Sequence, residues 1–306
     1  MKPSRRHLLA GSASLAALSA VGCKSPDSPP VTDSAGDSTT IDTGPLPDLG
    51  EPEVGSELWQ TMAAYVRASA DGEIGGRVNL FNPAAVPHRV VVQVFTLYGQ
   101  LVAREEISAL GAELSDHVEL HDLLERNDVP LPFEGHLWVG ATPESGRSFM
   151  GLQGIIFDWY GPAHIASVHG MRDFGNSNSD SSWSDLILPK VISTERYVSR
   201  VAIVNATADG VSEGLNARPQ VIIRDDEGEE LVNLELDELP PYCATIFTVD
   251  ELPGGDALSI GSIQILEPEA GLVAMAFLVD RDNDGFVSAD HFFDRHFVTH
   301  LAGFVG

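Results

Sequence analysis

The sequence predicts an all-β protein built from two tandem β-sandwich domains, and two observations predict this fold. First, short runs rich in β-branched and aromatic residues alternate with glycine-containing turns, which is typical of antiparallel strands. Second, the later part of the chain repeats the earlier part at an offset of about 123 to 130 residues. Helical periodicity is weak everywhere except near His121 to Arg126, where we expect one helical turn.

The N-terminus, residues 1–22, has the features of a signal peptide. Arg5 and Arg6 supply a basic start, an apolar run follows from Leu8 to Gly22, and small residues precede Cys23. The apolar run is shorter than the roughly 20 residues that a transmembrane helix needs. We therefore expect an export signal rather than a membrane span.

Two details of this segment resemble known export classes. The paired arginines followed by Leu8 and Leu9 resemble a twin-arginine export signal. Cys23 lies where a bacterial lipoprotein is cut and acylated, so the chain resembles a twin-arginine-exported lipoprotein. The resemblance implies lipidation of Cys23 and a place in the outer membrane or at the cell surface. An ordinary cleaved signal with an incidental cysteine is the alternative.

The next segment, residues 23–55, predicts a disordered tether. It is rich in Ser, Asp, Thr, Pro and Gly and has almost no large apolar side chains. Such a composition buries too little surface to fold. A flexible chain of this length would hold the folded part on the order of 30 Å from a membrane.

The repeat divides the rest of the chain into two domains, at residues 56–170 and 187–306, with a polar linker at residues 171–186. Consistent order with small changes in loop length indicates duplication. The aligned pairs are Asn82 with Asn205, Gly99 with Gly228, Leu101 with Leu231, Leu110 with Leu239, Leu123 with Leu252, and Met150 with Met275.

Each domain contains several predicted strands. The run 270–279 is apolar throughout, so we expect a strand that is buried on both faces. Strands of this number and spacing predict two sandwiches of immunoglobulin-like size. The other predicted strands are 90–97, 101–102, 136–139, 220–224, 231–236 and 262–265.

A strand that ends in asparagine, followed by a valine-rich strand and a glycine turn, occurs in both domains. Asn82-Pro83, Asn205, Gly99 and Gly228 carry this pattern. It resembles secreted bacterial β-sandwich repeats of unassigned activity. The resemblance implies an extracellular structural or adhesive module and names no ligand.

The charge balance limits the partners of the protein. The chain has 18 Lys plus Arg against 45 Asp plus Glu, a formal net charge of −27. This field repels nucleic acid and anionic headgroups. We therefore expect no nucleic-acid partner. The predicted place in the cell envelope implies the membrane as a partner through the lipid anchor, and envelope proteins or glycans as further partners.

One acidic loop predicts a structural calcium site. Alternating carboxylates followed by Gly285 match the first half of a calcium-binding loop, although no flanking helices are expected. A solvated acidic turn is the alternative. The expected ligands are Asp280, Asp282, Asp284, the backbone carbonyl of Phe286, Ser288 and Asp290.

The histidines and Cys243 have simpler interpretations. His296 and His300 are spaced to share a helix face and bind zinc, but surface or packing histidines are the favoured interpretation, as for His117 and His121. His164 and His169 are expected to line the junction between the domains. Cys243 lies in an apolar run and is expected to be a small buried residue rather than a reactive or paired thiol.

No constellation of catalytic residues stands out. The sequence has no Gly-x-Ser-x-Gly elbow and no CxxC pair. The favoured function is a non-catalytic structural or adhesive module of the cell envelope. The alternative is a secreted hydrolase that acts on glycans or peptides at a site between the two domains.

Overall fold

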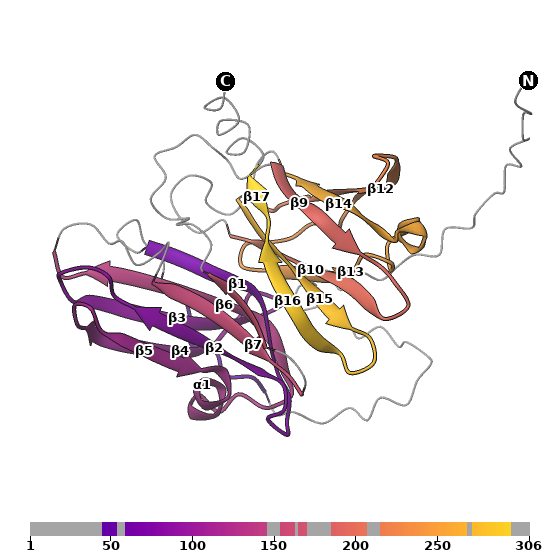
Figure 1. Ribbon diagram of the computed structural model, residues 1–306. Coiled ribbons are helices and arrows are strands. Elements are labelled where there is room, and N and C mark those ends of the chain that lie inside the picture. The colour runs from indigo at the N-terminus through magenta and orange to yellow at the C-terminus, as the bar shows by residue number, and fades with distance from the viewer. Residues whose placement is uncertain are drawn as a thin grey trace, which may run out of the picture.

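The computed structural model describes residues 45–53, 59–145, 154–162, 165–169, 185–206, 215–267 and 271–294. The predicted signal peptide, Cys23 and most of the predicted tether lie outside these residues. In the described part, antiparallel strands form four sheets, and the all-β sandwich prediction is confirmed (Figure 1). No helix among the described residues is long and apolar enough to span a bilayer.

The first domain, called unit 1, is a sandwich of two four-stranded sheets. Sheet A has the strand order β1-β6-β3-β4, and sheet B has the order β5-β2-β7-β8. A short helix, α1 (Leu120–Arg126), follows β5 and confirms the expected helical turn. The strands are β1 (Trp59–Ala68), β2 (Gly75–Phe81), β3 (His88–Thr96), β4 (Leu101–Leu110), β5 (Ser115–Glu119), β6 (Phe133–Pro143), β7 (Ile155–Tyr160) and β8 (Ile165–His169).

The second domain, unit 2, is also a two-sheet sandwich. Sheet C has the order β12-β11-β14-β9-β17, and sheet D has the order β13-β10-β15-β16. A 3-10 turn, η1 (Gly255–Ala257), takes the place of α1. The strands are β9 (Asp185–Ile192), β10 (Tyr197–Asn205), β11 (Gln220–Asp225), β12 (Glu230–Glu235), β13 (Ala244–Thr248), β14 (Ile260–Leu266), β15 (Leu272–Asp280), β16 (Gly285–His291) and β17 (Phe293–Asp294).

The strand orders of the two units confirm the duplication. The order β1-β6-β3-β4 recurs as β9-β14-β11-β12, and β5-β2-β7-β8 recurs as β13-β10-β15-β16. The aligned turn glycines are equivalent too, since Gly99 has φ 81° and Gly228 has φ 86°. Backbone angles of this sign favour glycine. Strand β2 pairs with β5 and β3 pairs with β6, as strand B does with E and strand C with F in the immunoglobulin fold. The pairing of β7 with β2 departs from that fold.

Three sequence-based details need correction. The alignment of Asn82 with Asn205 makes Asn79 equivalent to Ala202. Strand pairing places Ile156 opposite Asn79 and Met275 opposite Ala202. Met275 therefore corresponds to Ile156 and not to Met150, which lies outside the described residues. Strand β9 begins at Asp185, within the predicted linker. The predicted tether ends earlier than residue 55, because residues 45–53 lie along sheet A, where the Leu49 amide donates to the Leu101 carbonyl at 3.2 Å.

The alternation of side-chain direction along each strand determines which residues form the core. In β2, Val78 and Leu80 are buried between the sheets, while Arg77 and Phe81 point outward and are exposed. Strand β15 is buried on both faces, as its continuous apolar run predicts. It has no solvent face because unit 1 covers the outer side of sheet D.

The two units are joined by aromatic side chains and share one hydrophobic core. Tyr65 of β1 packs edge-on against Phe277 of β15, with ring centroids 5.7 Å apart, and Trp159 of β7 lies 5.0 Å from the same ring. Tyr242 of unit 2 packs 5.3 Å from Trp138 of sheet A. Figure 1 shows β15 and β16 lying against unit 1. The two units therefore pack against each other rather than forming separate domains without a shared core.

Candidate functional site

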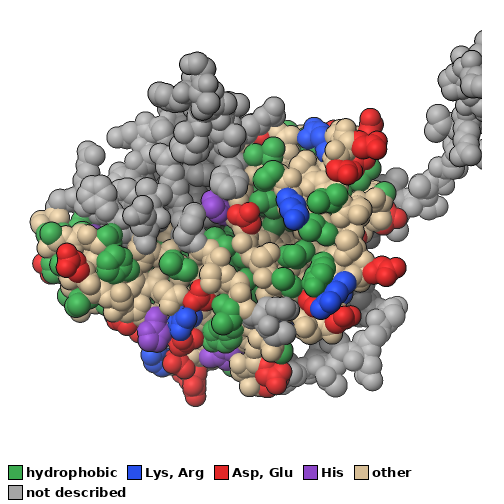
Figure 2. Space-filling view, viewed as in Figure 1, with side chains coloured by type: hydrophobic (Ala, Val, Ile, Leu, Met, Phe, Trp, Pro, Cys, Tyr) green, Lys and Arg blue, Asp and Glu red, His purple; other side chains and the backbone are tan. Residues whose placement is uncertain are grey.

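The outward-facing side of sheet B carries charged, polar and apolar side chains close together. We call it the outer face, and strand alternation defines it. Figure 2 shows histidine, basic, acidic and hydrophobic side chains close together over the lower part of unit 1. The outer face comprises Arg77, Asn79 and Phe81 of β2, Ser115, His117 and Glu119 of β5, Ile156, Asp158 and Tyr160 of β7, and Ile165 and Ser167 of β8.

Asp158 organises the polar half of this face. Its carboxylate accepts hydrogen bonds from Ser167 Oγ at 2.6 Å, Asn79 Nδ2 at 2.7 Å and Arg77 Nη2 at 3.0 Å. Its side chain is only 10% exposed. Burial pushes the pKa of Asp158 upward, but these three hydrogen bonds outweigh burial and hold the pKa below its ordinary value. Asp158 is therefore a fixed anion that orients its three donors.

Glu119 lies close to the other terminal nitrogen of Arg77. Its carboxylate lies 3.7 Å from Arg77 Nη1 and accepts a 3.1 Å hydrogen bond from Tyr160 Oη. Burial and the neighbouring Glu119 raise the pKa of Tyr160 to about 12. The phenol therefore remains a neutral donor, and Arg77 is shared between two carboxylates.

Apolar side chains on the outer face are exposed beside this network. Phe81 and Ile156 are each 40% exposed, and Ile165 is 71% exposed. Exposed large apolar groups that cluster on a surface mark a binding site more often than isolated ones do. Here they flank ordered polar groups on three adjacent strands.

A shallow groove of about 350 Å³ lies on the outer face. Its volume falls in the range of small-ligand sites, ~300–1,000 Å³. Asn79 and His117 are directly opposite each other on neighbouring strands within it. The lining is formed by Arg77, Asn79, Leu80, Phe81, Ser115, Asp116, His117, Gly154 and Ile156.

The equivalent face of unit 2 is covered. Met275 and Phe277 occupy the outward positions of β15 and are fully buried. The amide of Ala64 in β1 donates to Met275 Sδ at 3.2 Å, which places unit 1 directly on this face. The duplicated sheet face is therefore an interface in unit 2 and a free surface in unit 1.

Sequence reasoning did not single out this site. It named only His117, and as a surface or packing residue. The available signal is the alternation Arg77-x-Asn79-x-Phe81, which places three recognition-type side chains on one face of β2. That alternation does not say whether the face is covered.

The predicted calcium loop is described in full, and arginines bind two of its carboxylates. Asp280 is 1% exposed and lies 3.2 Å from Arg196 Nη2. Asp284 pairs with Arg200 at 3.0 Å and with Arg67 of unit 1. No group of three or more Asp, Glu, His or Cys side chains able to hold a metal occurs in the described part of the chain.

The other expected ligands do not join these two carboxylates. Asp282 is exposed, and its amide donates to Asp280 Oδ1 at 3.1 Å. Phe286 is buried at the unit junction, packed 4.9 Å from Phe277. Ser288 and Asp290 lie along β16 with their side chains exposed. Calcium binding therefore stays a sequence-based prediction.

The histidines named from the sequence are dispersed. His117 is exposed on β5, and His121 of α1 contacts the Ser69 carbonyl at 2.9 Å. His169 ends β8, whereas His164, His296 and His300 lie outside the described residues. The sequence did not indicate the histidine that is buried at the described junction, His136.

His136 is completely buried between the units. Its Nδ1 accepts a 3.0 Å hydrogen bond from Trp138 Nε1, so Nε2 carries the proton and donates to the Tyr242 carbonyl at 2.7 Å. Burial lowers the pKa of His136 to about 4, although the hydrogen bond to the Tyr242 carbonyl acts in the opposite direction. Around His136 the junction is thus packed and uncharged at neutral pH.

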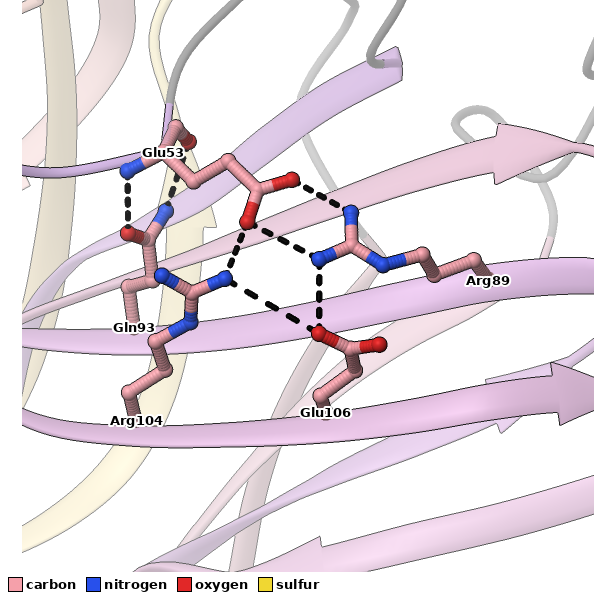
Figure 3. A network of polar contacts seen from close by, with 5 residues as sticks. All are labelled: Glu53, Arg89, Gln93, Arg104 and Glu106. Atoms are coloured by element: carbon pink, nitrogen blue, oxygen red, sulfur yellow. Dashed lines mark hydrogen bonds and ion pairs between the residues drawn. The ribbon is translucent and has the colours of Figure 1, made fainter.

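Glu53 fastens the N-terminal segment to the outer side of sheet A (Figure 3). Its carboxylate pairs with Arg104 and with Arg89, whose Nη2 lies 2.9 Å from Oε2. Its amide donates to Gln93 Oε1 at 2.7 Å, and Gln93 Nε2 donates back to its carbonyl at 2.9 Å. Arg89 also reaches Glu106 at 2.6 Å. This network holds residues 45–53 against sheet A.

Cys243 lies in the turn before β13. It is 4% exposed, which confirms the expected burial, but it is disulfide-bonded, so the expectation of an unpaired residue is wrong. The chain's other cysteine is Cys23, which lies outside the described residues. A lipidated cysteine has no sulfur available for a disulfide. Lipidation of Cys23 and an intramolecular disulfide therefore exclude each other in one molecule.

Comparisons with known proteins leave the family open. No family model matches the chain, and no curated protein matches it. Among solved structures, a glycosyl hydrolase family 2 member from Bacteroides cellulosilyticus matches at 12% identity and a TM-score of 0.20, covering 76% of this chain and 27% of its own. A putative beta-galactosidase from Bacteroides fragilis matches at 11% identity and a TM-score of 0.16, covering 74% and 31%. The chain thus spans less than a third of these structures, and such TM-scores transfer no activity to it.

Proposed function

We propose that this protein is a non-catalytic binding module of the cell envelope that engages its ligand with the outer face of sheet B. One observation carries the proposal: the outer face and its groove are exposed in unit 1, while the same face of unit 2 is buried in the unit interface. Duplication supplied two equivalent sheet faces. One joins the units, and the other remains available to a ligand.

The side chains of the outer face suit binding better than packing. Asp158 holds Arg77, Asn79 and Ser167 in fixed positions. Preorganised polar groups lose little conformational entropy when a ligand arrives. The exposed ring of Phe81 adds apolar area beside them.

Binding of the full chain to isolated cell envelopes tests this proposal. Phe81→Ala and Asn79→Ala should each weaken binding, measured by co-sedimentation across a range of protein concentrations. Tyr98→Ala is the matched control, because Tyr98 is an exposed aromatic residue, at 57%, outside the groove lining. Equal binding by wild type and both groove variants would contradict the proposal.

We also propose that the chain is exported and that a form in which Cys243 is not disulfide-bonded is anchored through Cys23 in the outer membrane or at the cell surface. The basic start, the short apolar run and the low-complexity segment after Cys23 support this placement. Membrane fractionation and intact mass of wild type, Cys23→Ser and Cys243→Ser test it. Wild type and Cys243→Ser should be membrane-bound and carry a lipid mass, and Cys23→Ser should not. A lipid-free wild type whose gel mobility changes on reduction would instead indicate a disulfide at Cys23.

A further inference from the structure

We propose that the ligand of the outer face is a neutral glycan, an inference that rests on the binding function proposed above. The recognition elements are the Asn79–His117 pair and the exposed ring of Phe81. Four features of the face lead to this class of ligand: its charge balance, its unused hydrogen-bonding groups, its exposed apolar side chains, and its contrast with the matching face of unit 2.

The charge balance favours an uncharged ligand. Arg77, the one arginine of the face, is already paired with Asp158 at 3.0 Å and with Glu119 at 3.7 Å. It therefore offers little attraction to an anion. The formal net charge of −27 repels anionic polymers further. A cationic ligand would compete with Arg77 for carboxylates that are already bound.

The groove offers hydrogen-bonding groups that hydroxyls can satisfy. Asn79 Nδ2 is held by Asp158 at 2.7 Å, which fixes the amide plane while its Oδ1 has no hydrogen-bond partner among the described residues. The exposed His117 ring, directly opposite on β5, also lacks one within the described structure. A sugar hydroxyl both donates and accepts, so one hydroxyl can meet an acceptor and the next a ring nitrogen.

Phe81 and Ile156 provide the apolar counterpart. Each is 40% exposed, and both lie in the groove lining with Asn79. A pyranose ring has an apolar face of C–H groups and an equatorial rim of hydroxyls. An aromatic ring beside planar hydrogen-bonding side chains matches both parts.

The matching face of unit 2 is buried against unit 1, so it shows which side chains this sheet face carries when it is covered by protein. There four outward positions of β10 and β15, Ala202, Val204, Met275 and Phe277, are buried and apolar, while Arg200, the equivalent of Arg77, pairs with Asp284. The positions equivalent to Ala202 and Val204 in unit 1 are Asn79 and Phe81, in a face with an ordered polar network. Fully desolvating that network against a protein would carry a large cost. A hydrated, hydroxyl-rich ligand avoids that cost.

The experiment compares three preparations of isolated envelopes: untreated, oxidised with periodate, which cleaves vicinal diols, and digested with protease. Full-length wild type should lose roughly tenfold or more in affinity for the periodate-treated envelopes and bind the digested ones normally. Neutral hexasaccharides of 1,4-linked glucose or mannose, whose residues carry vicinal diols, should compete, and an oligogalacturonate of equal length should not. Phe81→Ala should lose roughly tenfold, whereas Phe81→Trp should retain binding because it keeps the aromatic surface.

The outcomes separate the two proposals. Loss of binding after protease but not after periodate, still dependent on Phe81 and Asn79, would overturn the glycan and leave the binding face standing. Competition by the oligogalacturonate alone would overturn a neutral ligand. If Phe81→Ala and Asn79→Ala bind as tightly as wild type, or if wild type binds none of the envelope preparations, the binding function itself would be overturned.

Discussion

Asn82 and Asn205 occupy the same place in the two units and make the same hydrogen bond. Both are fully buried at the end of a strand. Asn82 Nδ2 donates to the Leu110 carbonyl at 2.9 Å, and Asn205 Nδ2 donates to the Leu239 carbonyl at 2.8 Å. Each buried amide therefore bonds the equivalent main-chain carbonyl of its own unit. The repeated asparagine is therefore a structural requirement of the fold.

Removing either amide should destabilise the protein strongly. Asn82→Ala leaves the carbonyls of Val86, Leu110 and Gly111 without this donor, and we expect a loss of about 3 kcal/mol in the free energy of unfolding. Asn205→Ala should cost a similar amount. The exposed Asn233→Ala is the control and should cost about 0.5 kcal/mol or less. Urea unfolding measures all three, and equal costs for the three variants would contradict this account.

Protonation of His136 should weaken the junction between the units. Its pKa is about 4 in the folded protein and 6.5 in the unfolded chain, so between these values the unfolded chain binds more protons. Stability is therefore lost as the pH falls, by about 2 kcal/mol between pH 7 and pH 5. His136→Gln should show a correspondingly flatter change over this range in urea unfolding. Parallel pH profiles for the two proteins would show that His136 does not contribute.

Asp284→Asn tests the ion pair across the junction to Arg67, the ion pair within unit 2 to Arg200, and the predicted calcium site. Asparagine tolerates the φ of 52° at this position, so the variant removes mainly the charge that binds Arg67 and Arg200. The carboxylate is 44% exposed, and we expect a loss of about 1 kcal/mol. Asp282→Asn, at an exposed residue of the same loop, should change stability little.

A chelator gives the second readout for that loop. EDTA should leave the melting temperature of wild type unchanged, because calcium would have to displace arginines from Asp280 and Asp284. A fall in melting temperature that Asp282→Asn abolishes would contradict this and support the sequence-based calcium prediction.

Glu53→Gln should release the N-terminal segment from sheet A. The hydrogen bond from Arg89 is the main cause of the lowered pKa of Glu53, so the contact persists at neutral pH and is lost as the pH falls through that lowered pKa. Amide hydrogen exchange in residues 45–53 should become faster in Glu53→Gln and stay unchanged in Glu51→Gln, which alters an exposed neighbour. Unchanged protection in Glu53→Gln would show that other contacts hold the segment.

Local patterns were sufficient to predict the strands and the duplication. Runs rich in β-branched and other apolar residues located β3, β11 and β15, and the paired glycines located the turns at Gly99 and Gly228. These features depend on neighbours in sequence, where periodicity and turn chemistry act.

The site and the junction depend on contacts between distant residues. Alternation shows that Asn79 and Ala202 face outward, but not that only the second is covered by the other unit. Arg67 reaches Asp284 across more than 200 residues of sequence, so the acidic loop resembled a cation site until its partners were placed. Side-chain polarity on the two equivalent faces was the signal that could have distinguished them.

Hydroxyl-radical footprinting of the full chain, with and without isolated envelopes, tests the outer face most directly, because it reports the solvent access of individual side chains. The account predicts that oxidation of Phe81 and His117 falls when envelopes are added, while oxidation of Tyr98 stays constant. Protection confined to other surfaces, with Phe81 and His117 oxidised as in the free protein, would contradict it.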